Sequence, residues 1–365
     1  MVATTSIQIT LKPLLAISIL LLLSPLARAQ PPRETLLSTD NAYNPIPSPD
    51  GKLIAYVRTG WGRPGGSGGF GRSNLVSDVA IIDAAGMPVT KAPLSDLFLS
   101  GWTPDGTRLV CYRDWEYALI SLDGTKAMQG RIPESSQGHA ASEWVSFSPS
   151  RATLVWSRQV DASHGIIESP DATIVSAGQL IGQRVVPSPD GRYFAVFSEW
   201  VESHLWVYDT QLESWTDLAK IRIHPDSNWR YIQPSWNPWF ADGSRVVYFS
   251  DSVLTVSSPD GRQKTEIPID ADAGLATPSP DGLSVAFATF EPRPMRTRPD
   301  LSFWGNSTIW VISPVPGARP RAVTLKNPDE TYDLRWLNNE TLVFDRIADE
   351  SFYQYARLWK ASVPP

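Results

Sequence analysis

Apolar residues in this chain gather in short runs, and turn-forming residues separate one run from the next. The run "RYFAVFS" after Gly191 is typical: it is rich in aromatic and β-branched residues, and Pro, Asp and Gly precede it. Short runs of this composition indicate β-strands. Beyond the N-terminal segment, no long stretch of apolar positions has the helical period. The pattern therefore predicts an all-β protein with almost no helix.

A Pro-Asp-Gly turn precedes many of these runs. Pro presets the first central position of a tight turn, and Gly adopts the positive φ that such a turn needs. Five good copies carry the aspartate and glycine, at Asp50 and Gly51, Asp105 and Gly106, Asp190 and Gly191, Asp242 and Gly243, and Asp281 and Gly282. Two degenerate copies have Ser150 and Asn339 at the aspartate position. We interpret these turns as structural, with each aspartate bonding to nearby backbone N–H groups.

The spacing of the turns indicates the architecture. Asp242 and Asp281 are 39 positions apart, and the other copies are separated by 40 or more. A four-stranded propeller blade takes roughly 40–45 residues. The seven copies therefore predict a seven-bladed β-propeller of four-stranded blades, in a single domain over residues 30–365. A further turn at Asp260 falls inside the shortest repeat, so we predict that it joins the third and fourth strands of that blade.

The last blade has one strand too few within its own sequence. Its third strand, "RLWKASVPP", ends the chain, and the segment Arg33–Asp40 has the pattern of an isolated strand. Open strand edges invite association, and propellers avoid them by closing the ring. We predict that this N-terminal strand pairs with the last blade.

Residues 1–29 have the features of a signal peptide. Lys12 precedes an apolar run, and Ala27-Arg28-Ala29 fits the small-residue cleavage rule. The apolar core, Leu14–Leu23, is shorter than the roughly 20 residues that a membrane span requires. We predict cleavage after Ala29, no membrane span afterwards, and a periplasmic or secreted location.

Charge and cysteine content restrict the function. The formal net charge is −6, and it becomes −8 without residues 1–29, which contain Lys12 and Arg28. An acidic chain is a poor partner for nucleic acid. Cys111 is the only cysteine, so no intramolecular disulfide forms. It lies in the strand-like segment "TRLVCYRD", where we expect a buried side chain without a catalytic role.

The repeated motif, as in "PSPDGRYFAVF" and "PSPDGKLIAYV", resembles the PD40 (WD40-like) repeats of the TolB-type β-propellers. The resemblance covers about residues 33–365. It implies the propeller fold and is compatible with an interaction role in the cell envelope. The oligogalacturonate lyases also resemble this fold, and they place a histidine-rich metal centre in it.

Three long insertions, Arg58–Asn74, Lys220–Trp239 and Phe290–Asn306, are predicted on the face opposite the Pro-Asp-Gly turns. Long loops at one end of a rigid scaffold commonly carry binding sites, and Arg with aromatic residues is typical of interfaces. The predicted binding residues are Arg58, Trp61, Arg63, Arg72, Arg222, Trp229, Arg230, Arg293, Arg296, Arg298 and Trp304. Trp236 and Trp239 lie in the same insertions. The alternative is that the arginines are solvated and the tryptophans pack between blades.

These features predict a monomeric binding or interaction module that acts through the long-loop face. The expected partner is an envelope or extracellular protein, or an acidic oligosaccharide or peptide. We assign no cofactor, no metal site and no catalytic residues.

The alternative is a carbohydrate-active enzyme of the oligogalacturonate lyase kind, with arginines that meet substrate carboxylates and a histidine-bound metal. The four histidines, His139, His164, His204 and His224, show none of the close spacings of common metal motifs.

Overall fold

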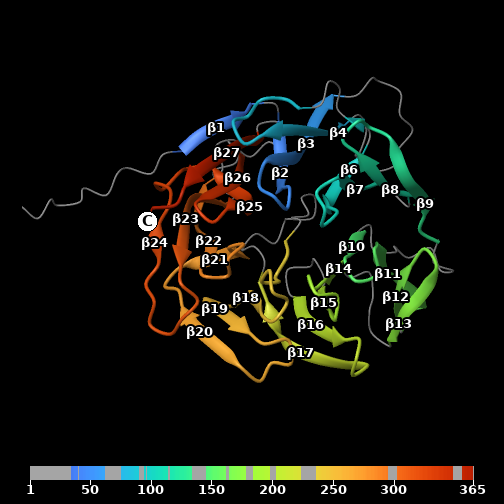
Figure 1. The fold of residues 1–365 in the computed structure, drawn as a ribbon. Coiled ribbons are helices and arrows are strands. Elements are labelled where there is room, and N and C mark those ends of the chain that lie inside the picture. Colours follow the sequence, from blue (N-terminus) through green and yellow to red (C-terminus); the bar gives the residue numbers. More distant parts are fainter. Residues whose placement is uncertain are drawn as a thin grey trace, which may run out of the picture.

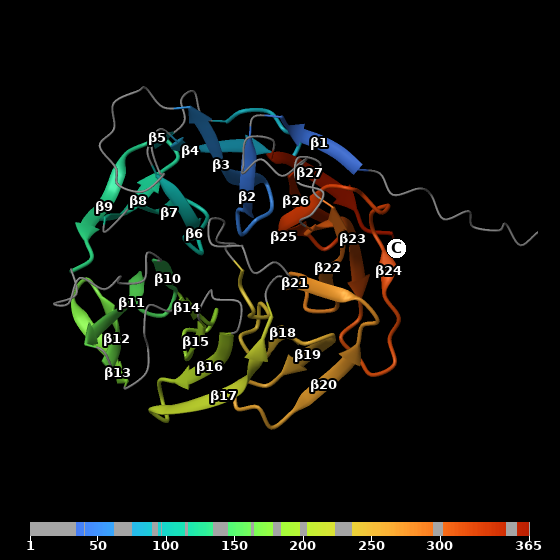
Figure 2. The ribbon, with the colours of Figure 1, turned by 180° about the vertical axis from the view of Figure 1, so that it is seen from behind.

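The computed structural model describes residues 34–39, 41–61, 75–89, 94–95, 97–113, 116–133, 145–161, 164–177, 184–197, 203–222, 236–294, 302–347 and 356–364. Its strands form seven antiparallel sheets arranged as a ring around a central axis (Figures 1 and 2). The all-β, seven-bladed propeller predicted from the turn repeats is confirmed. Within the described residues, no helix has the length and hydropathy needed to cross a membrane.

The first four blades follow the chain from the axis outward. The first consists of β2 (Ala42–Pro47), β3 (Leu53–Trp61), β4 (Leu75–Asp83) and β5 (Leu94–Ser95). The second consists of β6 (Phe98–Trp102), β7 (Arg108–Arg113), β8 (Glu116–Ser121) and β9 (Lys126–Arg131). The third consists of β10 (Ser146–Ser148), β11 (Thr153–Asp161), β12 (His164–Ser169) and β13 (Ala172–Ala177). The fourth consists of β14 (Arg184–Pro187), β15 (Tyr193–Phe197), β16 (Ser203–Asp209) and β17 (Ser214–Ile221).

The fifth and sixth blades have the same order. The fifth consists of β18 (Val246–Ser250), β19 (Val253–Ser257) and β20 (Lys264–Pro268), and a bridge from Trp239 to Val246 adds the innermost segment. The turn at Asp260 joins β19 and β20, the third and fourth strands, as predicted. The sixth consists of β21 (Asp272–Pro278), β22 (Val285–Pro294), β23 (Ser302–Ile312) and β24 (Arg321–Ala322).

The seventh blade joins the two ends of the chain. It consists of β25 (Glu330–Asn338), β26 (Thr341–Ile347) and β27 (Ala356–Ser362), with β1 (Glu34–Ser38) as its outermost strand. Thr35 of β1 lies opposite Lys360 of β27 in an antiparallel pair, and Figures 1 and 2 show the two strands side by side. Glu34 forms an ion pair with Arg346, which is 1% exposed. The predicted closure of the ring by the N-terminal strand is confirmed.

The apolar core lies between the blades. Each sheet lies between two neighbouring blades, one against each of its faces. Four consecutive residues of β15, Phe194 to Phe197, are therefore all buried. Sheets covered on both faces carry continuous apolar runs instead of alternating ones. Cys111 of β7 is also buried, as predicted, and burial raises the pKa of its thiol to about 12.

A hydrogen bond that involves a side chain crosses each of the seven junctions between neighbouring blades, close to the axis. In order around the ring, these bonds join Trp102 to Ile46, Ser100 to Val145, Ser146 to Val185, Trp239 to Val186, Trp236 to Ala276, Trp336 to Thr277, and Asp345 to Asn44. In the first six, an indole N–H or a hydroxyl donates to a backbone carbonyl of the adjacent blade. Buried donors need such partners, so these bonds fix each blade against the next.

Trp236 and Trp239 therefore pack between blades, which is the alternative that the sequence left open. Both are buried. The indole N–H of Trp236 donates to the carbonyl of Ala276 (2.8 Å), and that of Trp239 donates to the carbonyl of Val186 (2.9 Å).

The junction between blades seven and one uses a buried carboxylate in place of an indole or hydroxyl. Asp345 Oδ2 accepts from the backbone N–H of Asn44 (3.1 Å), and its Oδ1 accepts from those of Tyr332 (3.1 Å) and Asp333 (2.8 Å). Burial and the nearby Asp333 raise the pKa of Asp345 from 3.8 to about 8. The folded protein therefore binds a proton at this site more tightly than the unfolded chain does.

The first prediction concerns ring closure. Removal of residues 30–40 from the mature chain lowers the melting temperature and promotes association, because β27 becomes an open edge and the buried Arg346 loses Glu34. Differential scanning calorimetry and light scattering measure both effects. Glu34→Gln in the full-length mature chain serves as the control, because it removes the charge and keeps the strand. An unchanged melting curve for the truncated protein would contradict closure by β1.

The second prediction concerns Asp345. Because its folded pKa is raised, the stability that it contributes is complete below pH 3.8 and is lost as the pH rises through about 8. The free energy of unfolding should fall between pH 5 and 8 by at most about 1.4 kcal/mol per pH unit from this group. Asp345→Asn, which cannot ionise, should flatten this slope in urea titrations. Asp333 and Arg335 are unchanged in this variant. Identical slopes for the two proteins would refute the raised pKa.

Candidate functional site

The Pro-Asp-Gly turns use most of their own polar groups. In the first turn, the Ser48 hydroxyl donates to Asp50 Oδ1 (2.7 Å), which also accepts from the backbone N–H of Lys52 (3.2 Å). The N–H of Leu53 donates to the Ser48 hydroxyl (3.0 Å). These bonds, that from Ser48 above all, lower the pKa of Asp50 to about 2. The turns at Asp105, Asp190, Asp260 and Asp281 repeat this arrangement.

Neighbouring turns also pack against each other. Gly51 has a φ of 68°, and a Cβ at this position would collide with the carbonyl oxygen of Leu337 in blade seven. The backbone N–H of Asp281 donates to the side chain of Asn339 in the next blade (3.1 Å). The turns therefore form a tight collar around one face of the ring.

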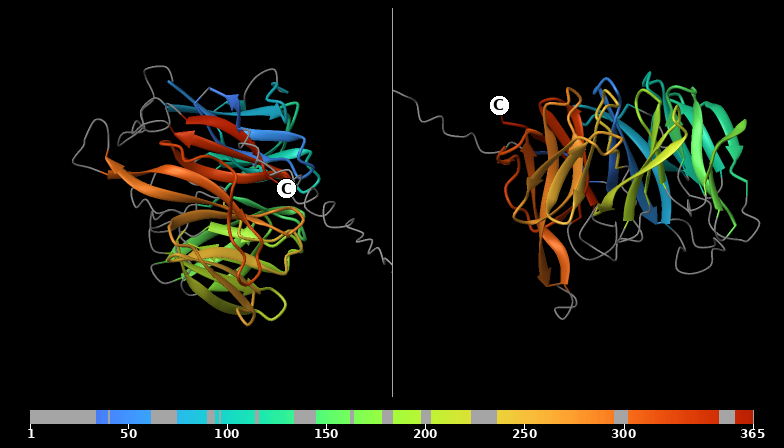
Figure 3. Two further views of the ribbon diagram at one scale, coloured as in Figure 1. Left: turned by 90° about the vertical axis from the view of Figure 1, so that its left-hand side faces the viewer. Right: turned by 90° about the horizontal axis from the view of Figure 1, so that it is seen from below.

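The structure describes the side chains of three residues in the predicted long-loop set. Arg58 of β3 pairs with Asp78 (3.4 Å), and Arg222 pairs with Asp272 (2.9 Å). Arg293 lies in β22 beside Gly305 of β23. The three arginines come from blades one and six and from the segment after β17. The hairpin of β22 and β23, orange in Figure 3, extends beyond one face of the ring.

The other members of that set are described less fully or not at all. Trp61 and Trp304 lie in β3 and β23, and their side chains fall outside the described part of the structure. Arg63, Arg72, Trp229, Arg230, Arg296 and Arg298 lie outside the described residues. The long-loop face as a binding site stays a prediction.

Of the histidines, only His204 has a described side chain. Its ring lies 3.1 Å from Asp217 on the exposed surface. His164 belongs to β12, whereas His139 and His224 lie outside the described residues. No group of three or more His, Cys, Asp or Glu side chains suited to a metal occurs among the residues that the structure describes.

A cavity of about 520 Å³ lies on the axis, and the innermost segments of all seven blades line it. Pockets that bind small molecules measure roughly 300–1,000 Å³. Prolines from five turns line one end of the cavity: Pro49, Pro104, Pro149, Pro189 and Pro280. All of these except the half-buried Pro149 are exposed, so the cavity meets solvent at the turn face.

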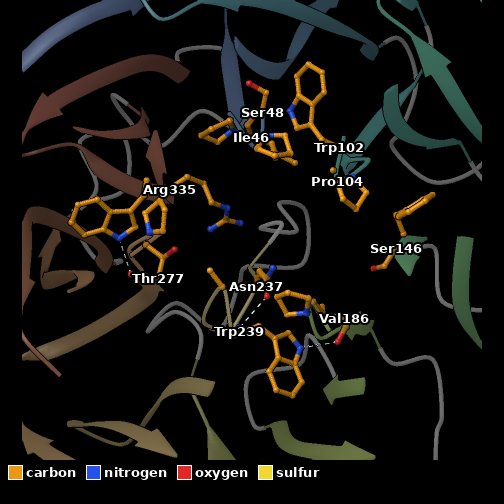
Figure 4. A pocket seen from close by; sticks show the side chains of 18 of the residues that line it. Ile46, Ser48, Trp102, Pro104, Ser146, Val186, Asn237, Trp239, Thr277 and Arg335 are labelled. Carbon is orange, nitrogen blue, oxygen red and sulfur yellow. Dashed lines mark hydrogen bonds between the residues drawn. The ribbon is translucent and has the colours of Figure 1, made fainter. Parts of the chain in front are cut away.

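Three tryptophans line the cavity: Trp102, Trp239 and Trp336. Figure 4 shows Trp102 and Trp239 in its wall. Their indole N–H groups are the ones that donate across the blade junctions, so the aromatic rings are fixed. The hydroxyls of Ser100 and Ser146 in the wall likewise donate to backbone carbonyls. The wall is therefore rigid, and it is largely apolar toward the cavity.

Two charged residues, Arg184 and Arg335, stand out among the described residues that line the cavity, and no lining residue there is acidic. Arg184 is 3% exposed, and its guanidinium lies 5.8 Å from the ring centroid of Phe197. Arg335 is 9% exposed, and Figure 4 shows its side chain reaching toward the middle of the cavity.

Arg335 links the cavity to the buried carboxylates of blade seven. Its Nη1 donates to the carbonyl of Leu334 (2.8 Å), and its Nη2 lies 3.7 Å from Asp333 Oδ1. Burial lowers the pKa of Arg335, although Asp333 and Asp345 act in the opposite direction. Arginine keeps its charge in proteins, and this guanidinium is poorly hydrated because it is buried.

Sequence reasoning missed this cavity and both arginines. For Arg335, a signal was present in the sequence. In each repeat one residue stands directly before the aromatic residue or proline that leads into the turn, and Arg335 holds this position before Trp336. That position points toward the axis in several blades, but charge occurs there in only one of the described copies.

Comparisons with known proteins agree with the fold. No protein-family model matches this chain, and no curated protein matches it. The crystal structure of the Cps50 (Swd1) β-propeller domain from Myceliophteria thermophila is similar over 91% of this chain and 100% of that chain, with 12% sequence identity and a TM-score of 0.57.

TolB proteins are also among the similar solved structures. TolB from Acinetobacter baumannii matches over 76% of this chain and 65% of that chain, with 17% identity and a TM-score of 0.40. A putative TolB from Agrobacterium tumefaciens matches over 72% of this chain and 89% of that chain, with 13% identity and a TM-score of 0.39. Membership of the PD40 family specifically stays a prediction. The chain is a seven-bladed β-propeller with a cavity at its axis.

Proposed function

We propose that this protein is a binding module whose ligand enters the axial cavity from the face of the Pro-Asp-Gly turns. The observation that carries the proposal is the cavity itself, because all seven blades contribute to one concave, rigid, mostly apolar site of about 520 Å³. Concave apolar sites with few polar groups are the usual form of a ligand site.

The proposal places this module outside the cytoplasm, in the periplasm or in the medium. The signal-peptide features of residues 1–29 support this placement. The proposal also treats residues 30–365 as one domain, since the blades from β1 to β27 form one ring. The long-loop face is kept as a second surface, and the experiment below separates it from the cavity.

A substitution at Gly101 tests the cavity directly. Gly101 lies in β6 and lines the cavity, and a Cβ placed on it would meet no heavy atom within 4 Å. Gly101→Trp therefore introduces a bulky side chain into the cavity from a position where the Cβ has open space. Met128→Trp is the matched control, since Met128 is 36% exposed on β9, the outermost strand of the same blade.

The third prediction is that Gly101→Trp loses the natural ligand of the mature protein and that Met128→Trp keeps it. Affinity capture from native envelope extract, followed by mass spectrometry of proteins and small molecules, measures this. A variant with Pro292–Gly305 replaced by a short turn tests the long-loop face in the same experiment. If the folded Gly101→Trp variant retains every component that the wild type retains, the cavity is not the binding site.

A further inference from the structure

Several polar groups of the cavity wall are engaged in hydrogen bonds, and the two charged residues among its described members, Arg184 and Arg335, are both cations. We propose that its ligand is a small amphipathic anion, with a carboxylate or similar group at Arg335 and Arg184 and an apolar body against the proline and tryptophan wall. This inference rests on the binding site proposed above and names its ligand class.

The charge of the wall favours an anionic group. Arg184 and Arg335 are the charged members of the described lining, and both are positive. Asp333 Oδ1 lies 3.7 Å from Nη2 of Arg335, and Asp333 is fully buried within blade seven. Because burial has removed much of the hydration of Arg335, an anion in the cavity recovers interaction energy that water does not supply.

The position of Arg184 favours a ligand whose charged group lies away from the turn face. Arg184 begins β14 and Pro187 ends it, so the two Cα atoms are about 10 Å apart along the strand, at roughly 3.3 Å per residue. Pro187 leads directly into the turn at the mouth. A ligand that enters from the turn face, as proposed above, therefore passes the proline collar before it reaches Arg184, and its uncharged part stays beside the collar.

The engaged donors argue for an apolar body instead of a sugar chain. The wall includes four serines, and the hydroxyls of Ser48 and Ser279 donate to turn aspartates, just as those of Ser100 and Ser146 donate to backbone carbonyls. The three wall tryptophans donate across blade junctions. An oligosaccharide would bury many hydroxyls against few available donors, at a cost in free energy. An aromatic or aliphatic anion carries no such cost.

A matched pair of fluorescent probes separates the charge from the apolar body. 8-Anilinonaphthalene-1-sulfonate is an amphipathic anion, and N-phenyl-1-naphthylamine is the same molecule without its sulfonate. We expect one sulfonate probe to bind per mature protein. Gly101→Trp should abolish this binding, and Met128→Trp should leave it unchanged.

The fourth prediction concerns Arg335. Arg335→Met together with Asp333→Asn removes both members of the ion pair, so that neither charge is left buried without the other. This double variant should bind the sulfonate probe about tenfold or more weakly than the wild type does. The uncharged probe should change little. Arg335→Lys keeps the charge and should retain part of the affinity. Melting curves of each variant establish that it is folded.

Competition experiments test the apolar body. 1-Naphthoate should displace the sulfonate probe at lower concentration than trigalacturonate, which has carboxylates without an apolar body. The reverse order would overturn the amphipathic part of the inference.

The remaining outcomes distinguish this inference from the proposed function. If both probes bind with equal affinity, are blocked by Gly101→Trp, and are unaffected by the changes at Arg335, the anion inference fails and the cavity remains a binding site. If the sulfonate probe binds to Gly101→Trp as it does to the wild type, or if neither probe binds to the wild type, the inference is overturned. In the second case, retention of a natural ligand in the capture experiment still supports the proposed function.

Discussion

Closure of the ring is the constraint on which the rest of this structure depends. The seven sheets share no strands, so contacts between the blades must fix how each sheet lies against the next. The two ends of the chain must also meet in the last sheet. A side-chain hydrogen bond at each junction and the pairing of β1 with β27 meet this requirement. Buried donors left without partners would be costly, so each junction also specifies how its two blades fit together.

The same bonds determine the chemistry of the axis. Indole N–H groups and hydroxyls near the axis are turned sideways into neighbouring blades, which leaves ring faces, prolines and aliphatic groups toward the cavity. Arg184 and Arg335 are the charged exceptions in the described wall. Arg184 and Arg335 therefore determine the charge of the described site, whereas the junction bonds leave the rest of its wall mainly apolar. At the seventh junction, the buried Asp345 adds a proton whose binding depends on the folded state.

Much of the fold was predictable because its determinants are local. Five copies of the turn carry Gly at a positive φ directly after Asp, so each of them indicates a hairpin, and together with the two degenerate copies they could be counted into blades. The N-terminal strand was recognisable because the last blade was incomplete. The segment Trp236–Trp239 is predicted as the end of a long insertion, since an innermost strand with two prolines nearby and little regular pairing resembles a loop in sequence.

The candidate site could not be predicted in the same way. Arg184 and Arg335 come from blades four and seven and occupy different positions of the repeat, so only the closed ring brings them to one cavity. The loop arginines were more conspicuous in the sequence because they lie in long insertions. Of these, Arg58 and Arg222 form ion pairs with aspartates of the same scaffold. Whether an arginine faces a cavity or a carboxylate depends on contacts between distant segments.

The most direct test of this account is a crystal structure of the mature protein soaked in sodium bromide, with bromide located by its anomalous scattering. The account predicts a bromide ion inside the axial cavity, within contact distance of the guanidinium of Arg335 or Arg184. Bromide ions bound on the outer surface together with an axial cavity that contains none would contradict the claim that ring closure builds an anion-binding site at the axis.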